Sequence, residues 1–240
     1  MIITKEWLIE HFNNNENRRT LEDRLPSGSI DKDLIEFGEI ELDLIGLEAN
    51  KFIERLIEIE ELEWANWLIT QVLSKKNCVA YALYATKQAF PIWEKYLPHD
   101  NRPKKAIDAV WKWLNGENPI ATLVESVAES ADTAAYTVRP ADDSNAADVE
   151  VADACAATAF ADSRTAYAAL AEIIYDTDTP AYMTLKYAYG TDIAYFAVTM
   201  AVNAINNNET YIEILSYGLL IYELTLMDVD FQLCSLHIHK

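Results

Sequence analysis

Apolar residues recur every three or four positions through most of the chain, which is the period of an amphipathic helix. The pattern becomes regular at residues 65–72, where apolar side chains occupy positions i, i+3, i+4 and i+7. A polar link at 74–77 separates this helix from a second one, which continues the period through residues 79–90. Pro91 is expected to kink the second helix or to end it, because proline lacks the backbone N–H that an α-helix needs.

A third helix is predicted after the turn at residues 98–101. Asp100 or Asn101 can cap its start, and Pro103 lies in its first turn. Gly116 stands where a C-terminal cap is expected. The buried stripe of this helix is predicted to consist of Ile107, Val110, Trp111 and Leu114.

The second half of the chain is predicted to be helical as well. Helices are expected at about residues 120–136, 193–205 and 211–227. Residues 144–175 are rich in alanine, which has the highest helix propensity and lets helices approach closely, so we expect one or two helices packed against the bundle. The stretch to Lys240 is compatible with a short strand as well as with irregular structure.

Residues 1–60 look different, with short helices and loops. Thr4 can cap a helix that runs through Phe12, and the run of asparagines that follows should end it. The predicted fold is therefore an all-α multi-helix bundle with an Ala-rich C-terminal half and a small irregular helical N-terminal module. The predicted domains are an acidic N-terminal helical module, residues 1–60, and a helical bundle domain, residues 61–240.

Charge narrows the possible partners. The formal net charge is −20 and the sequence pI is about 4.4. Such a surface repels nucleic acid and anionic membranes, and it attracts basic proteins. A large net charge also keeps a protein soluble, so charge alone does not decide between a solvated surface and a docking surface. Residues 31–63 are notably acidic and are the predicted steering region for a basic partner.

The predicted compartment is the cytoplasm. Three cysteines, Cys78, Cys155 and Cys234, are an odd and scattered set, which argues against a disulfide framework. The first residues lack the apolar core of a signal peptide, and no apolar stretch approaches the roughly 20 residues of a membrane span. Oligomeric state stays open, since the Ala-rich helices could pack within the chain or across a dimer.

Few residues suggest catalysis. None of the four histidines, at positions 11, 99, 237 and 239, has metal-site spacing, and no phosphate-binding or nucleophile motif occurs. Cys78 has no histidine near it in sequence, which favours a buried structural thiol. The pairs Asp176 with Asp178 and Asp228 with Asp230 lie near turns, where aspartate is common for backbone reasons. We therefore expect no enzyme, no cofactor and no metal.

The candidate partner-binding residues are carboxylates of the acidic region and two tryptophans that could anchor an interface. They are Glu36, Glu39, Glu41, Asp43, Glu54, Glu58, Glu61, Trp64 and Trp67.

One segment carries a distinctive motif. Its helix ends near Pro-Ile-Trp-Glu at 91–94, a Pro-x-Asp-x-Arg-Pro run with a following Ala-Ile-Asp covers 98–108, and Trp113 and a Gly-Glu pair close it. With these features, residues 64–117 resemble the immunity-protein-five-like family of bacterial toxin immunity proteins. The opening residues 4–8 resemble an N-terminal module of some relatives. Residues 144–175 are more acidic and Thr-rich than the family pattern, and residues 176–240 match nothing in it.

The resemblance implies a partner-binding protein. Its motif also has a structural interpretation, in which Asp100 caps a helix, Pro103 fixes the helix start and Arg102 holds a carboxylate such as Glu94 or Asp108. We favour that interpretation over direct toxin contact. The motif residues are Pro91, Glu94, Pro98, Asp100, Arg102, Pro103, Ile107, Trp113 and Gly116.

Three functions follow, in order of preference. The first is a non-catalytic immunity-type inhibitor that occludes a toxin, for instance a basic nuclease, through an acidic surface. The second is a phage-encoded inhibitor that mimics nucleic acid, such as an anti-CRISPR protein, which requires a stripe of carboxylates spaced like phosphates. The third is a metal-dependent helical enzyme, which requires carboxylates and histidines that converge in a pocket.

Overall fold

The computed structural model describes residues 1–13, 44–117, 121–138, 146–175 and 190–227. All regular elements in these ranges are helices, and the described residues add one isolated β-bridge between Ile2 and Glu48. The all-α prediction is confirmed. The chain forms two compact units, Met1–Val72 and Leu73–Lys240, whereas the sequence places the boundary after residue 60.

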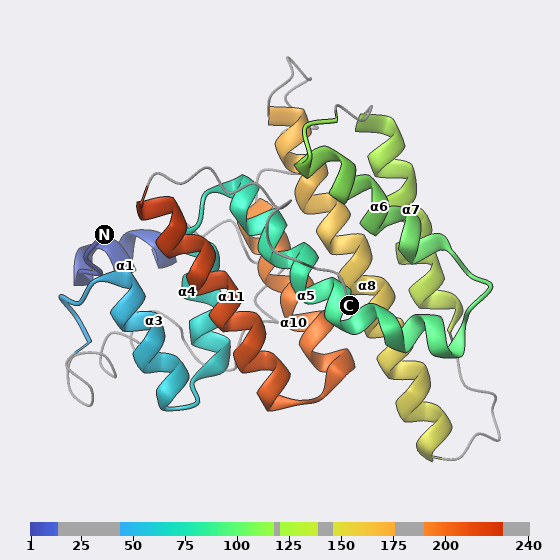
Figure 1. The fold of residues 1–240 in the computed structure, drawn as a ribbon, viewed down its shortest axis with the longest axis horizontal. Coiled ribbons are helices and arrows are strands. Elements are labelled where there is room, and N and C mark those ends of the chain that lie inside the picture. The colour runs from blue at the N-terminus through green and yellow to red at the C-terminus, as the bar shows by residue number, and fades with distance from the viewer. Residues whose placement is uncertain (14–43, 118–120, 139–145, 176–189, 228–240) are drawn as a thin grey trace. The chain divides into compact units, whose positions relative to one another are not determined.

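The first unit contains helices α1 (Lys5–Asn13), α3 (Ala49–Glu58) and α4 (Leu62–Val72) (Figure 1). The Thr4 hydroxyl accepts a hydrogen bond from the Trp7 N–H at 3.2 Å, so the predicted cap is confirmed. Helices α3 and α4 pack against each other.

The second unit contains six described helices (Figure 1). They agree with the predicted ranges to within a few residues, and the Ala-rich segment forms a single helix of 30 residues. The helices are α5 (Lys75–Tyr96), α6 (Arg102–Leu114), α7 (Ala121–Thr137), α8 (Ala146–Tyr175), α10 (Gly190–Ile205) and α11 (Asn208–Leu226).

Helix α8 is the centre of this unit, because α5, α6, α7 and α10 all pack against it. Small side chains line these contacts, and they let the helix axes approach closely. The buried alanines of α8 and α10 are Ala152, Ala159, Ala161, Ala166, Ala168, Ala169, Ala194, Ala197, Ala201 and Ala204.

Three local predictions need correction. Pro91 does not end its helix, since α5 continues to Tyr96; the proline ring is exposed, and the buried Ala89 and Trp93 beside it hold the helix to the core. The link at 74–77 is shorter than predicted, because the Ser74 hydroxyl caps α5 by accepting the Asn77 N–H at 3.3 Å. Trp111 lies at the edge of its stripe and is half-buried rather than buried.

One charged group lies in the core of the second unit. Asp162 on α8 is fully buried, and neither carboxyl oxygen has a hydrogen-bond partner among the described residues. Thr165, which is also buried on α8, does have a hydrogen-bond partner. Its hydroxyl and the hydroxyl of Thr86 on α5 hydrogen bond to each other at 2.8 Å. Burial raises the pKa of Asp162 well above its usual value, because an unpaired carboxylate is poorly solvated there.

We predict that Asp162→Asn stabilises the protein at neutral pH. Because the pKa of Asp162 is raised in the folded state, its carboxyl contributes fully to stability only below its unfolded-state pKa of about 3.9. This contribution to stability is lost as the pH rises through the folded-state pKa. Asparagine matches the neutral acid in size and carries no such penalty. Urea unfolding should show a gain of more than about 1 kcal/mol at pH 7.5 and almost none near pH 3.5.

The matched control is Asp153→Asn, because Asp153 is exposed on the same helix. This variant should change the free energy of unfolding little at either pH. Equal effects of the two substitutions, or a gain at Asp162 that does not depend on pH, would show that Asp162 does not titrate in the core.

Candidate functional site

The family-like motif forms the corner between α5 and α6. Asp100 precedes α6, and its carboxylate accepts the backbone N–H of Arg102 at 3.1 Å, which satisfies one donor at the helix start. The Arg102 guanidinium closes on the same carboxylate, with Nε 3.0 Å from both oxygens and Nη2 2.5 Å from Oδ2. A two-pronged arginine–carboxylate pair of this kind is strong and fixes orientation.

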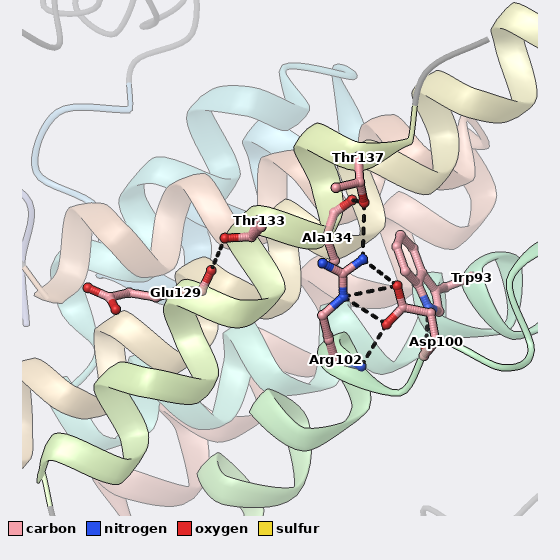
Figure 2. A network of polar contacts seen from close by, with 7 residues as sticks. All are labelled: Trp93, Asp100, Arg102, Glu129, Thr133, Ala134 and Thr137. Atoms are coloured by element: carbon pink, nitrogen blue, oxygen red, sulfur yellow. Dashed lines mark hydrogen bonds and ion pairs between the residues drawn. The ribbon is translucent and has the colours of Figure 1, made fainter. Parts of the chain in front are cut away.

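The corner also joins its neighbours (Figure 2). The Trp93 indole on α5 donates its Nε1–H to the Asp100 carbonyl at 2.8 Å. Arg102 Nη2 donates to the Thr137 hydroxyl at the end of α7 at 3.0 Å, and that hydroxyl donates to the Ala134 carbonyl at 2.7 Å. The corner thus connects three helices, and the Asp100, Arg102 and Thr137 side chains each make more than one of its hydrogen bonds.

A hydrophobic cluster lies beneath this network. Trp93, which is 1% exposed, packs with Ala134 and Ala135 of α7 and with Cys155 and Ala159 of α8. The cluster explains why the tryptophan can donate to a loop carbonyl without exposure to water, since its ring fills the space between the helices.

The predicted partner of Arg102 was wrong. Arg102 pairs with Asp100, while Asp108 pairs with Lys104 one helical turn away at 3.0 Å, and Glu94 is exposed. The reason is local, because the turn that starts α6 brings residues 100 and 102 together. Hydrogen bonds from the Arg102 side chain lower the pKa of Asp100, and Asp100 raises the pKa of Arg102.

The remaining motif positions also support the helix ends. Pro103 is buried in the first turn of α6, as predicted. Gly116 follows the end of α6 with φ +84°, and its N–H donates to the Trp113 carbonyl at 3.0 Å. The Glu117 N–H donates to the Lys112 carbonyl at 3.0 Å, which completes a glycine-dependent helix cap.

The candidate partner-binding carboxylates lie in the first unit, and four of them, Glu36, Glu39, Glu41 and Asp43, fall outside the described residues. On α3, Glu54 accepts from Lys51 at 2.7 Å and Glu58 accepts from Arg55 at 2.6 Å. The side chains of both pairs are exposed, so each cation offsets its neighbouring carboxylate at the surface. Glu61 is half-buried.

The two candidate tryptophans of α4 pack edge to face, with ring centroids 6.3 Å apart. Trp67 is only 4% exposed and Trp64 is half-buried. Their positions favour a core role for Trp67, and they leave Trp64 with the larger accessible surface.

Residues considered for catalysis do not gather in the described part of the chain. No group of three or more His, Cys, Asp or Glu side chains there could hold a metal ion. His11 stacks on Trp7 with ring centroids 3.8 Å apart, His99 is exposed, and Cys78 is buried. His237, His239, Cys234 and the pairs at 176/178 and 228/230 fall outside the described residues. Within the described helices, none is long and apolar enough to cross a membrane.

The part of the chain that contains the corner and its three helices matches a family model. Residues 68–178 match the family described as Imm-5 like putative immunity protein. The resemblance seen in residues 64–117 is confirmed, and the match extends through α7 and α8. Neither the search of curated proteins nor the search of solved structures found a match.

Sequence reasoning missed two parts of the corner. The pairing of Asp100 with Arg102 has a sequence signal, because an Asp two residues before an Arg, just ahead of Pro103, is placed to bridge a helix start. The bond from Arg102 to Thr137 has none, since 35 residues separate the two in the chain.

We predict that Asp100 and Arg102 are coupled by about 1 kcal/mol at pH 7 in a double-mutant cycle of unfolding free energies with Asp100→Ala and Arg102→Ala. Water partly screens this ion pair and limits the coupling, because the Asp100 and Arg102 side chains are 24% and 31% exposed. Because the pKa of Asp100 is lowered in the folded state, its carboxylate stabilises the fold above the unfolded-state pKa of about 3.9. This stabilisation is lost as the pH falls through the folded-state pKa. The coupling should therefore fade at acidic pH.

The exposed pair of Lys104 and Asp108 provides the reference cycle, with an expected coupling of about 0.3 kcal/mol. If the two couplings were equal at pH 7, the corner would be no more than an ordinary surface ion pair.

Proposed function

We propose that the chain is a non-catalytic immunity-type protein that neutralises a toxin by tight, non-covalent binding and occlusion. The match of residues 68–178 to the Imm-5 like family is the observation that carries the proposal. Immunity of this kind needs a surface that is already shaped before the toxin arrives, because ordering a surface on binding reduces affinity. A corner fixed by Asp100 and Arg102, and a bundle packed around α8, support such a surface.

The charge supports a basic partner, for example a nuclease whose active site attracts nucleic acid. A protein of net charge −20 attracts a basic protein over distances of a Debye length, about 8 Å at physiological salt, and raises the association rate. The acidic region at residues 31–63 remains our proposed contributor to this steering, together with the carboxylates of the second unit. Occlusion itself then depends on shape and on buried contacts rather than on net charge.

Co-expression with a toxin, which the proposal expects to be encoded beside this gene, tests the proposal. Cells that produce the toxin should grow only when this chain is also produced, and the purified chain should inhibit the toxin's activity at an equimolar ratio. The association rate should fall steeply as salt is added, while the dissociation rate changes little. Unrelieved toxicity in cells that contain folded, soluble protein would contradict the proposal.

A further inference from the structure

The charge of the second unit is not evenly distributed. Residues 75–112, which include α5 and α6, carry eight basic against three acidic residues, although the whole chain has a net charge of −20. The next helix, α7, contains no lysine or arginine. The basic residues are Lys75, Lys76, Lys87, Lys95, Arg102, Lys104, Lys105 and Lys112.

The outward side of α6 is basic. Ala106, Ile107, Val110 and Leu114 face the core, so Lys104, Lys105 and Lys112 lie on the other side and are exposed. Asp108 stands among them and is paired with Lys104. Three lysines against one carboxylate leave this side with a positive surplus.

An aromatic ring lies at the edge of that side. The Lys87 ammonium from α5 lies over the Trp111 ring, 4.2 Å from its centroid. Burial lowers the pKa of Lys87, and Asp108 and Lys104 are close enough to act on it in opposite directions. The cation–π contact holds the half-buried tryptophan in place beside the lysines.

The outward side of α7 has the opposite sign. Glu125, Glu129 and Tyr136 are spaced i, i+4 and i+11, which places them on one side of the helix. Glu129 is exposed, Glu125 is half-buried, and Tyr136 is 59% exposed. Tyr136 is nevertheless ordered by an edge-to-face contact with Phe160 of α8, with ring centroids 5.1 Å apart. An ordered, exposed tyrosine is a common anchor of protein interfaces.

The two helices lie side by side and run in opposite directions (Figure 1). The bond from Arg102 to Thr137 joins the start of α6 to the end of α7. Lys104 and Lys105 therefore lie at the same end as Tyr136. The basic row and the acidic row are therefore carried by two neighbouring helices within the segment that matches the family.

We propose that the outward sides of α6 and α7 form the toxin-binding surface, and that the toxin presents an acidic element to α6 and a basic element to α7. We call this the α6–α7 surface; its members are Lys104, Lys105, Lys112, Glu125, Glu129 and Tyr136. The assignment rests on the proposed function and deepens it. Two rows of opposite sign allow one orientation of the partner, because reversal would bring like charges together.

The charge pattern favours a protein partner over two other occupants. Nucleic acid would find lysines on α6 but would be repelled by α7 and by the net charge of −20. A second copy could in principle place its α6 against α7 of the first, but two molecules of net charge −20 repel each other. A toxin with a basic surface and an acidic element is attracted at long range and fits locally.

Two pairs of double charge reversals test the assignment with matched net charge. Lys104→Glu with Lys105→Glu is compared with Lys75→Glu and Lys76→Glu, since both pairs are exposed in the first turn or so of their helices. Glu125→Lys with Glu129→Lys is compared with Glu209→Lys and Glu213→Lys near the start of α11. Acidic residues near a helix N-terminus are favoured by the helix dipole, so the Lys→Glu substitutions at the starts of α5 and α6 should be tolerated.

The readout is the dissociation constant for the toxin that the chain neutralises in the co-expression experiment, with thermal unfolding as a check on each variant. Both α6–α7 variants should raise the dissociation constant at least about tenfold, which is about 1.4 kcal/mol, while both control variants stay within about threefold of the unchanged protein. Tyr136→Ala should weaken binding as well, mainly through faster dissociation.

Several results would overturn the assignment. Unchanged affinity in both α6–α7 variants would place the interface elsewhere, and loss in only one would show an interface of one sign. Equal loss in the controls would mean that only net charge matters. Sedimentation that showed a dimer disrupted by the same variants would identify a second copy as the occupant. In these cases the unchanged protein still neutralises the toxin; if it does not, the proposed function itself fails.

Discussion

The close packing of α8 is the constraint on which the second unit depends. Four helices touch it, and alanines at the contacts leave little room for any larger side chain. Enlarging one of these alanines would force the neighbouring helices apart, since well-packed cores accommodate added volume poorly. Asp162 is an exception to the apolar character of this core, and a buried carboxyl without a partner opposes stability. Asp162 therefore lowers the stability of the protein at one position of its most closely packed helix.

The motif and the proposed binding surface have different physical tasks. Asp100, Arg102 and Gly116 set where α6 begins and ends, and the bond to Thr137 sets how α6 lies against α7. None of these groups needs to touch a toxin in order to matter. They hold two helices in register, so substitutions on the outward sides of those helices should leave the core undisturbed.

Sequence periodicity predicted the helices because the contacts that bury an apolar stripe repeat along one element. It also located the cap at Thr4 and the glycine at the end of α6, where local backbone chemistry decides. Of the two outcomes predicted at Pro91, a kink or an end, the end is wrong, because exposure of the ring and packing of the opposite side let the helix continue. It also missed the burial of Asp162, since whether a carboxylate on an Ala-rich helix faces solvent depends on how many helices surround it.

The proposed binding surface was harder to predict for the same reason. Counting charges identified residues 31–63 as acidic, yet the pairs that Lys51 and Arg55 make on α3 show that a count does not give the local field. The lysines of α6 and the glutamates of α7 belong to different segments, and only the packing of α6 against α7 makes these segments neighbours. Net charge then describes how a partner approaches, and the local rows describe how it is oriented.

Chemical footprinting of lysines tests the central claim most directly. The free protein and its complex with the toxin are treated briefly with an acetylating reagent, and the modification of each lysine is measured by mass spectrometry. Lys104, Lys105 and Lys112 should be protected in the complex, while Lys75 and Lys76 react as in the free protein. Equal modification of the α6 lysines in the free and bound states would contradict the claim that the toxin covers this part of the molecule.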